Sequence, residues 1–225
     1  ASGIVIGWKR AVEAKATLSF EDVVGYCSWL LEAEYAEGKA SLPPSDSSSD
    51  YREIRIEIAR LVESILDMYG ESLKKSQMRR LLDMLESLAA TDPRISEGER
   101  AYDESDDPFM ASLNMLYPIT LTAVGKWIAN GRESDRSEME RAYGILDTAL
   151  PPNTESRAEI TALAMAIGWL LDMDSPWLHE NREALFGGEN PDANQRLLIA
   201  LLVDLYMPNE SLFAFMRPAL LTSLE

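Results

Sequence analysis

Residues 19–31 have the sequence Ser-Phe-Glu-Asp-Val-Val-Gly-Tyr-Cys-Ser-Trp-Leu-Leu. Apolar residues recur in it every three or four positions, a spacing that places them on one face of an α-helix. Ser19 is a typical N-cap residue, and the acids Glu21 and Asp22 complement the positive end of the helix dipole. The stretch therefore predicts an amphipathic helix that ends near Gly38. Its buried face is expected to comprise Phe20, Val23, Val24, Cys27, Leu30 and Leu31.

The same spacing extends over most of the chain, and no stretch sustains the alternation of apolar and polar residues that a strand would show. Capping residues, glycines and prolines mark the expected helix ends. Asp50 begins one helix and Gly70 closes it, while Asn153 or Thr154 begins a later one. We expect further helices at residues 4–16, 50–70, 76–90, 108–130, 137–150, 153–171, 176–186, 192–206 and 210–223.

Three segments depart from this pattern. Residues 41–50 are rich in Ser, Pro and Asp, which neither propagate a helix nor bury apolar area, so they predict a surface loop. Residues 94–107 form an acidic, poorly patterned connection whose carboxylates are expected to face solvent. Pro118 lies inside the expected helix at 108–130 and predicts a kink or a break there.

The expected elements define the fold class. Helices of ordinary length, joined by short connections, predict antiparallel packing of sequential neighbours. Helix pairs recur roughly every 35 to 45 residues, the range of HEAT and related repeats. The sequence therefore predicts an all-α fold in which antiparallel helix pairs stack as an α-solenoid, with an irregular helical bundle as the alternative. We expect residues 1–225 to form a single helical domain and, because no methionine precedes Ala1, to be a piece of a longer protein.

The chain is strongly acidic, with 38 Asp and Glu against 21 Lys and Arg and a formal net charge of −17. Nucleic-acid binding needs positive charge against the phosphates, so this balance disfavours it. No apolar run approaches the roughly 18 residues of a membrane span, and the N-terminus lacks signal-peptide features. One basic patch consists of Lys74, Lys75, Arg79 and Arg80. We expect it to be a solvated helix face whose charge is balanced by Glu71 and Asp83.

The single cysteine and single histidine restrict the chemistry further. Cys27 cannot form an internal disulfide, which fits a cytoplasmic protein, and its apolar neighbours predict a buried, unreactive thiol. Zinc sites built from Cys and His need more ligands than Cys27 and His179 supply. His179 lies on a short expected helix next to Trp177, a context that favours packing or capping over catalysis. No cofactor is expected, because the chain holds neither a Gly-rich phosphate loop nor a nucleophile elbow.

Clustered carboxylates are a further candidate site, because hard divalent cations bind converging oxygens. Residues 103–107 and 172–174 lack the ligand spacing of an EF-hand and are expected to be solvated loops. One Glu-x-x-Glu pair matches the spacing by which all-α nucleotide pyrophosphatases hold Mg²⁺, although the acids of the next helix do not reproduce the second pair of that family. The alternative metal ligands, in a small Mg-dependent nucleotide hydrolase, are Glu34, Glu37, Glu63 and Asp67.

Tryptophans are the remaining large side chains. A tryptophan at helical spacing is more typical of a core than of a ligand site. Trp8, for example, lies on the same side of its helix as Ile4 and Val12. Some are nevertheless expected to line grooves between helices, where a stack of helix pairs recruits partners. The five are Trp8, Trp29, Trp127, Trp169 and Trp177.

Two parts of the chain resemble helical-repeat regions of very large bacterial proteins. Residues 107–114, Asp-Pro-Phe-Met-Ala-Ser-Leu-Asn, followed by Leu-Thr-Ala-Val at 121–124, are similar to a segment in which an Asp-Pro start precedes an Asn and a small-residue helix. Residues 177–179 and 184–187 look like the pattern of a Trp-x-His helix that leads to Leu-Phe. The chain departs from the pattern at 115–118, where an Arg-Gly step is usual. The resemblance covers about half of the chain and carries over no functional residue.

The resemblance also implies a context. Such regions are often attached to nucleotide-hydrolase or Sir2-type modules, and some of the parent proteins resemble antiviral defence effectors. Together with the absence of a catalytic motif, this favours a non-catalytic helical scaffold within a larger intracellular bacterial protein. Its expected partner is another protein, or a neighbouring domain of the same chain, rather than nucleic acid or a membrane.

Overall fold

The computed structural model describes residues 2–37, 47–91, 94–104, 107–131, 134–173, 175–187, 191–204 and 210–222. Within these ranges every regular element is a helix, which confirms the expected all-α fold. The elements are α1 (Ser2–Glu13), α2 (Phe20–Glu37), α3 (Ser47–Tyr69), the 3-10 turn η1 (Gly70–Ser72), α4 (Lys75–Ala89), α5 (Glu97–Asp103), α6 (Pro108–Ser112), α7 (Leu116–Asn130), α8 (Arg136–Asp147), α9 (Arg157–Asp172), α10 (Pro176–Glu180), α11 (Arg182–Phe186), α12 (Pro191–Ile199), the π-helical turn η2 (Ala200–Asp204) and α13 (Glu210–Thr222).

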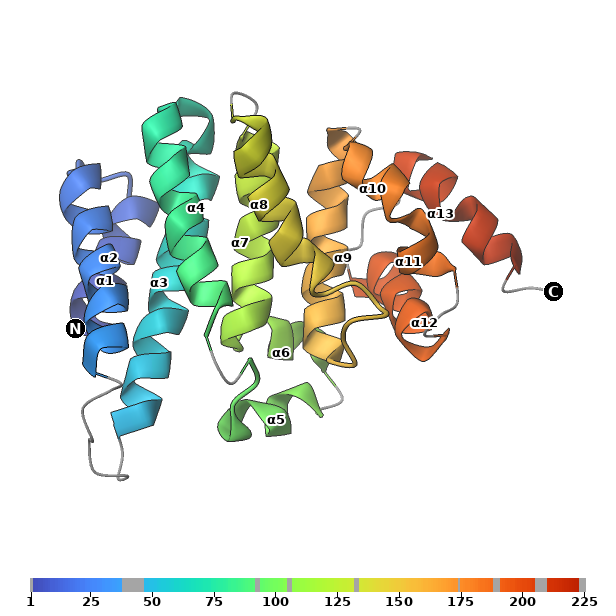
Figure 1. Cartoon of the computed structure of the whole chain (residues 1–225), viewed down its shortest axis with the longest axis horizontal. Coiled ribbons are helices and arrows are strands. Elements are labelled where there is room, and N and C mark those ends of the chain that lie inside the picture. Colours follow the sequence, from blue (N-terminus) through green and yellow to red (C-terminus); the bar gives the residue numbers. More distant parts are fainter. Residues whose placement is uncertain are drawn as a thin grey trace.

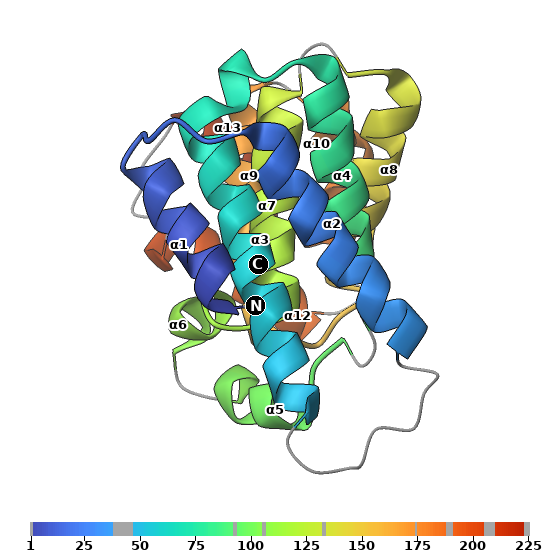
Figure 2. The ribbon, with the colours of Figure 1, turned by 90° about the vertical axis from the view of Figure 1, so that its left-hand side faces the viewer.

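The longer helices form two layers (Figures 1 and 2). In the first layer α1, α3, α7 and α9 lie side by side, each packed against the next. In the second layer α2 lies beside α4, and α4 beside α8. The chain rises through a first-layer helix and descends through a second-layer helix, so sequential neighbours are antiparallel and the four first-layer helices are parallel to one another. At the far end of the stack, α12, η2 and α13 pack against α9.

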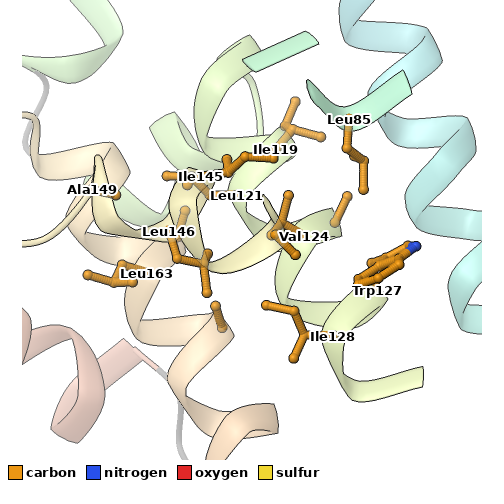
Figure 3. Packing of buried hydrophobic residues seen from close by; sticks show 14 of the residues in the cluster. Leu85, Ile119, Leu121, Val124, Trp127, Ile128, Ile145, Leu146, Ala149 and Leu163 are labelled. Carbon is orange, nitrogen blue, oxygen red and sulfur yellow. The ribbon is translucent and has the colours of Figure 1, made fainter. Parts of the chain in front are cut away.

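Helix α7 lies at the centre of this arrangement. Almost all of its side chains are buried, which is expected for a helix that is apolar on every side. It packs against α3, α4, α8 and α9, and Figure 3 shows Leu121 and Val124 of α7 close to Leu146 of α8. Trp127 is fully buried, and its indole N–H donates a hydrogen bond of 2.7 Å to the Met78 carbonyl. One continuous apolar core therefore extends through both layers, from Val5 to Met216.

Helices α7 and α9 approach each other closely. A Cβ atom added at Gly125 would lie 2.7 Å from Ala166 Cβ and 2.9 Å from Ala166 Cα, distances that real Cβ atoms do not show. Glycine at this position therefore lets the two helix backbones approach. Small residues on both helices replace interdigitating side chains at this one crossing point.

The boundaries of α2 and α4 agree with the sequence patterns. The Asp22 backbone N–H donates to Ser19 Oγ at 3.3 Å, which confirms the expected cap of α2. Four side chains of its expected inner face are buried, while Phe20 and Leu30 are partly buried against the core. In α4 all five expected core residues are buried, namely Met78, Leu81, Leu82, Leu85 and Leu88.

Helix α3 begins earlier than expected. It starts at Ser47 rather than after Asp50, so part of the expected 41–50 loop is helical and residues 41–46 lie outside the described ranges. The pattern in α1 was also partly misread. Val5 and Val12 are buried there, whereas Ile4, expected on the inner face, is 49 % exposed.

The expected helix at 108–130 is two helices. α6 ends at Ser112 and α7 begins at Leu116, so the break lies before Pro118 instead of at it. Pro118 occupies the first turn of α7, where the missing backbone N–H would have had no intrahelical acceptor. The expected helix at 176–186 is likewise divided, at Asn181, into α10 and α11.

Two further expectations were wrong. The cap of α9 is Ser156, whose Oγ accepts from the Glu159 N–H at 3.2 Å, and not Asn153 or Thr154. The connection at 94–107, expected to be irregular and solvated, contains helix α5 and buries Glu99.

None of the described helices is both long and apolar enough to cross a bilayer.

Candidate functional site

A network of buried charges lies where α7 and α9 begin. Glu99 of α5 is 6 % exposed and forms an ion pair with Arg52 of α3. Its Oε1 accepts from the Leu116 backbone N–H at 2.8 Å, and its Oε2 from the Ser96 N–H at 2.9 Å. Burial alone raises the pKa of Glu99, but the hydrogen bonds from Arg52, Leu116 and Ser96 outweigh it and hold the pKa below its ordinary value.

A second carboxylate of α5 caps the start of α9. Asp103 Oδ1 accepts hydrogen bonds from Ser156 Oγ at 2.7 Å and from the Ala158 N–H at 3.0 Å. Negative charge at this position complements the positive end of the α9 dipole. The acids that were expected to be solvated therefore serve as caps for two helices of the first layer. Of the remaining carboxylates of the run, Glu104 is exposed and Asp107 accepts from the Met110 N–H at 2.9 Å, while Asp106 lies outside the described residues.

Arg94 joins the network to the core. Its guanidinium lies 4.0 Å from the centre of the Tyr117 ring, and it forms an ion pair with Glu159 of α9 and donates to the Thr148 carbonyl at 3.0 Å. Glu159 is 1 % exposed, and burial raises its pKa despite the nearby Arg94. Its Oε1 has no hydrogen-bond partner among the described residues. The ion pairs of the network join its charged groups to each other, which makes it a clamp between α3, α5, α7 and α9.

The alternative metal ligands are only partly described. Glu63 Oε1 and Asp67 Oδ2 of α3 both accept from Lys126 Nζ of α7, at 2.9 and 2.6 Å, and this ammonium lies 5.3 Å from the centre of the Trp169 ring. A lysine thus occupies the space between these two carboxylates. The side chains of Glu34 and Glu37 lie outside the described residues. Among the described residues no three His, Cys, Asp or Glu side chains are placed to hold a metal ion together.

The single cysteine and the single histidine lie in different environments, the first buried and the second exposed. Cys27 is buried, and burial raises the pKa of its thiol to about 12, so the reactive thiolate is suppressed at neutral pH. His179 is exposed at the surface of α10, and the centre of its ring lies 6.4 Å from the centre of the Phe215 ring in an edge-to-face arrangement. Trp177 is buried beside it, and its indole N–H donates to Asp147 Oδ1 at 2.7 Å.

Three of the four residues of the basic patch form ion pairs, although with other acids than Glu71 and Asp83. Lys75 Nζ lies 2.6 Å from Asp135 Oδ1 at the start of α8, and Arg79 pairs with Asp135 and Glu138. Arg80 pairs with Glu21 of α2, and Asp83 pairs with Arg141 of α8. These ion pairs connect neighbouring helices of the second layer.

Exposed large apolar side chains gather at the two ends of the stack. Trp29 of α2 is 56 % exposed, and it continues a row of rings in which the centres of Trp8 and Tyr26 are 5.3 Å apart and those of Tyr26 and Trp29 are 5.7 Å apart. Core burial was therefore the wrong expectation for Trp29. One end of the stack is formed by α1 and α2, and the other by α12, η2 and α13 (Figure 1). These elements carry most of the exposed large apolar residues, namely Ile4, Trp29, Ile199, Leu202, Phe213 and Leu221.

Three connected hollows surround the turn between α3 and α4, at the end of the molecule where α1 and α7 also finish (Figure 1). The first, of about 400 Å³, lies against the α1–α2 connection. The second and third, of about 390 and 360 Å³, lie against the end of α7. Tyr69 and Ser72 line both the first and the second, and Gly70 and Glu71 both the second and the third. We call these three neighbouring hollows together the turn groove.

Neither the turn groove nor the charged clamp was foreseen from the sequence. Both are assembled from residues tens of positions apart, and no local spacing announces them. Comparison with known proteins adds no assignment: no protein-family model, no curated protein and no solved structure matches this chain. The arrangement of the residues themselves is therefore the basis for a functional proposal.

Proposed function

We propose that this chain is a non-catalytic helical scaffold that binds other protein, as a HEAT-like part of a larger intracellular bacterial protein. The observation that carries the proposal is the collection of exposed apolar side chains at the two ends of the helix stack, with Trp29 at one end and Phe213 at the other. Contiguous exposed apolar groups on a folded protein mark contact surfaces. The occupant that suits them is a further helix of the same larger protein, packed onto α1 and α2 or onto α13 as these pack onto their neighbours.

The location of the charged groups supports a binding role over catalysis. Titratable groups with shifted pKa values, such as Glu99 and Glu159, are held by arginines in a clamp between helices. The carboxylates Glu63 and Asp67 hold a lysine. Perturbed groups of this kind indicate an active site only when they face a cleft, and here they face the protein itself.

The proposal is tested on the exposed apolar surfaces of α1 and α2 at one end and of α12, η2 and α13 at the other, which we call the terminal faces. Because the isolated chain lacks an occupant for them, it should self-associate at high concentration, and the Ile4→Ser, Trp29→Ser double variant should reduce this in sedimentation velocity. Met110→Ser removes an exposed apolar side chain of α6, away from both ends, and serves as the matched control. A chain that stays monomeric at all concentrations, or a control variant that has the same effect, contradicts the proposal.

The hydrolase alternative is separated by ligand binding. Mg²⁺ or Mn²⁺ with a nucleotide should leave the Tm unchanged, because a ligand stabilises a protein only if it binds the folded state. A rise in Tm at micromolar nucleotide, abolished in Glu63→Gln, would favour the enzyme.

A further inference from the structure

We propose that the outer face of α2 binds a basic amphipathic helix of the same larger protein, one that places lysine or arginine side chains against Trp29 and the acids beside it. This inference rests on the proposed scaffold function and adds the chemistry of the occupant at one of the two terminal faces. It concerns the side of α2 that faces away from α3 and α4, at the end of the stack that Figure 2 shows.

Helix α2 carries negative charge only. Residues 20–37 contain no lysine or arginine but five acids, namely Glu21, Asp22, Glu32, Glu34 and Glu37. Glu21 forms an ion pair with Arg80 of the neighbouring helix α4. Asp22 and Glu32 are exposed, and no ion pair joins either of them to a residue of the described ranges. Two carboxylates on the surface of α2 are therefore available to a partner.

These two acids share one face of the helix with the exposed tryptophan. Because an α-helix turns by about 100° per residue, Asp22, Trp29 and Glu32 lie within about 80° of one another around the helix axis. The two acids are separated by about 15 Å along α2, and the tryptophan lies between them. The face of an indole ring attracts cations, and a carboxylate close to the ring adds an ion pair to the same cation. The outer face thus offers an apolar ring between two anchoring points for positive charge.

The same combination of ring, cation and carboxylate occurs inside the protein. The ammonium group of Lys126 lies 5.3 Å from the centre of the Trp169 ring and pairs with Glu63 and Asp67 of α3. The charged clamp places a guanidinium against an aromatic ring and a carboxylate in a similar way. No lysine or arginine lies over Trp29 in the part of the chain that the structure describes. A cation from a covering helix would complete this arrangement on α2.

Ion pairs also join the neighbouring helices of the second layer. Glu21 of α2 pairs with Arg80 of α4, and Arg79 of α4 pairs with Glu138 of α8. In both contacts a carboxylate of one helix meets a guanidinium of the next. A helix that extended this layer beyond α2 would meet the two exposed acids. Bases on its inner side would therefore continue the pattern of the layer.

The bases of α1, the other helix at this end, do not neutralise the acids of α2. Lys9 Nζ lies 3.6 Å from Glu13 Oε1 of the same helix. Arg10 and Lys15 are exposed, and Lys15 follows the end of α1 with a φ of 55°. Within the described ranges neither of them forms an ion pair with an acid of α2. An acidic helix would bring like charges together on α2, so a basic one is favoured.

Trp29 and the acids should contribute to binding in different ways. Burial of the exposed ring removes apolar surface from water and supplies most of the affinity. Ion pairs at exposed positions add less, but they favour partners of the opposite charge and weaken as the salt concentration rises. Variants of the ring and variants of the acids should therefore differ in their effects.

The test uses a fluorescein-labelled, alanine-rich helical peptide of about 18 residues. It carries two arginines about eleven positions apart, to match the spacing of the acids, and two leucines between them on the same face. One further peptide has glutamates for the arginines, and another has serines for the leucines. Fluorescence anisotropy should show the tightest binding for the arginine–leucine peptide, and circular dichroism checks that all three are equally helical.

The variants separate the ring from the charges. Trp29→Ser should weaken binding of the arginine–leucine peptide more than ten-fold. The Asp22→Lys, Glu32→Lys variant should weaken it about ten-fold and should reverse the preference between the arginine and glutamate peptides. The neutral variant Asp22→Asn, Glu32→Gln should give a smaller loss, and it keeps the test valid if the charge reversal disturbs the start of α2. Thermal unfolding of each variant checks that it remains folded.

The matched control is Asp192→Lys, Glu210→Lys, which makes the same change of charge on exposed first-turn acids of α12 and α13, at the opposite end of the molecule (Figure 1). It should alter binding less than two-fold. Equal weakening by the two charge reversals would mean general attraction to an acidic protein and would overturn the proposal, as would absent binding or preference of the wild type for the glutamate peptide. If the peptide test fails while the Ile4→Ser, Trp29→Ser variant still reduces self-association, the basic occupant is rejected and the scaffold function stands.

Discussion

Glu99 caps a helix that begins 17 residues later in the sequence: its Oε1 accepts a hydrogen bond of 2.8 Å from the backbone N–H of Leu116, the first residue of α7. The preceding residue, Met115, has no side chain that can cap, so the central helix begins on a carboxylate supplied by α5. The same carboxylate pairs with Arg52 of α3. One side chain therefore holds three helices together.

Removal of this carboxylate should be costly. We expect Glu99→Ala to lower the free energy of unfolding by about 3 kcal/mol, because it leaves the Arg52 charge and the Leu116 N–H without Glu99 as a partner. Urea denaturation measures this loss. The control is Glu97→Ala, in the same helix at an exposed position, with an expected change within about 0.5 kcal/mol. Similar losses for both variants would contradict the cap.

The same residue should make stability depend on pH. Because the folded protein lowers the pKa of Glu99 below its ordinary value of 4.5, the carboxylate adds stability above that pH, and this contribution is lost as the pH falls through the lowered value. The Tm of wild type should therefore exceed that of Glu99→Gln at pH 7, and the difference should shrink towards pH 3. A difference that is constant over this range would show that Glu99 does not titrate as described.

Substitution by alanine should have opposite effects on stability at two helix glycines, one at the α7–α9 crossing and one on the open face of α8. Gly125→Ala should destabilise by about 1 to 3 kcal/mol, because the new methyl group would lie 2.7 Å from Ala166 Cβ. Gly144→Ala, on an open face of α8 with no atom within 4 Å, should stabilise by about 0.5 to 1 kcal/mol through helix propensity. Chemical denaturation of both variants checks the pair, and a stabilising Gly125→Ala would refute the close approach.

Lys126 should be needed for stability rather than for catalysis. We expect Lys126→Met to lower the unfolding free energy by about 2 kcal/mol, since Glu63 and Asp67 then lie side by side without the cation. Lys9→Met breaks only the exposed pair with Glu13 and should cost no more than about 0.5 kcal/mol. Equal costs for the two variants would mean that the partly buried position of Lys126 is unimportant.

The strained backbone at Lys15 yields a prediction of increased stability. Lys15→Gly should raise the unfolding free energy by about 0.5 to 1 kcal/mol, because glycine adopts a φ of 55° without the steric cost that a side chain brings. Differential scanning calorimetry measures the rise in Tm. Arg10→Gly, inside α1, is the control and should destabilise. An unchanged or lower Tm in Lys15→Gly would argue against stored strain.

Much of the helical framework follows from local spacing. The inner faces of α2 and α4 could be predicted directly, because apolar residues recur every three or four positions along each helix. Spacing is less informative where a helix is apolar all round, as α7 is. It also misleads where an apolar residue lies on the exposed side of a helix, as Ile4 does in α1. The expected break near Pro118 was displaced because proline is readily accommodated in a first helical turn.

The charged clamp and the turn groove could not be predicted in the same way. Glu99 and Asp103 look like solvated acids in the sequence, and only the folded arrangement brings them to the first turns of α7 and α9. The turn groove depends on how closely Gly70 approaches Asn130, which are sixty positions apart. Such pairings depend on the packing of helices that are distant in the sequence. A single sequence does not encode them as a local pattern.

Helices α1 and α13 lie at opposite ends of the long axis of the molecule (Figure 1). A tensile load applied through these two helices would run across the stack, so it would be resisted by side-chain packing between adjacent helices and not by hydrogen bonds along any one of them. The weakest lateral contact would then yield first. Mechanical stability would be set by the terminal helix pairs, well before the close α7–α9 crossing at the centre gave way.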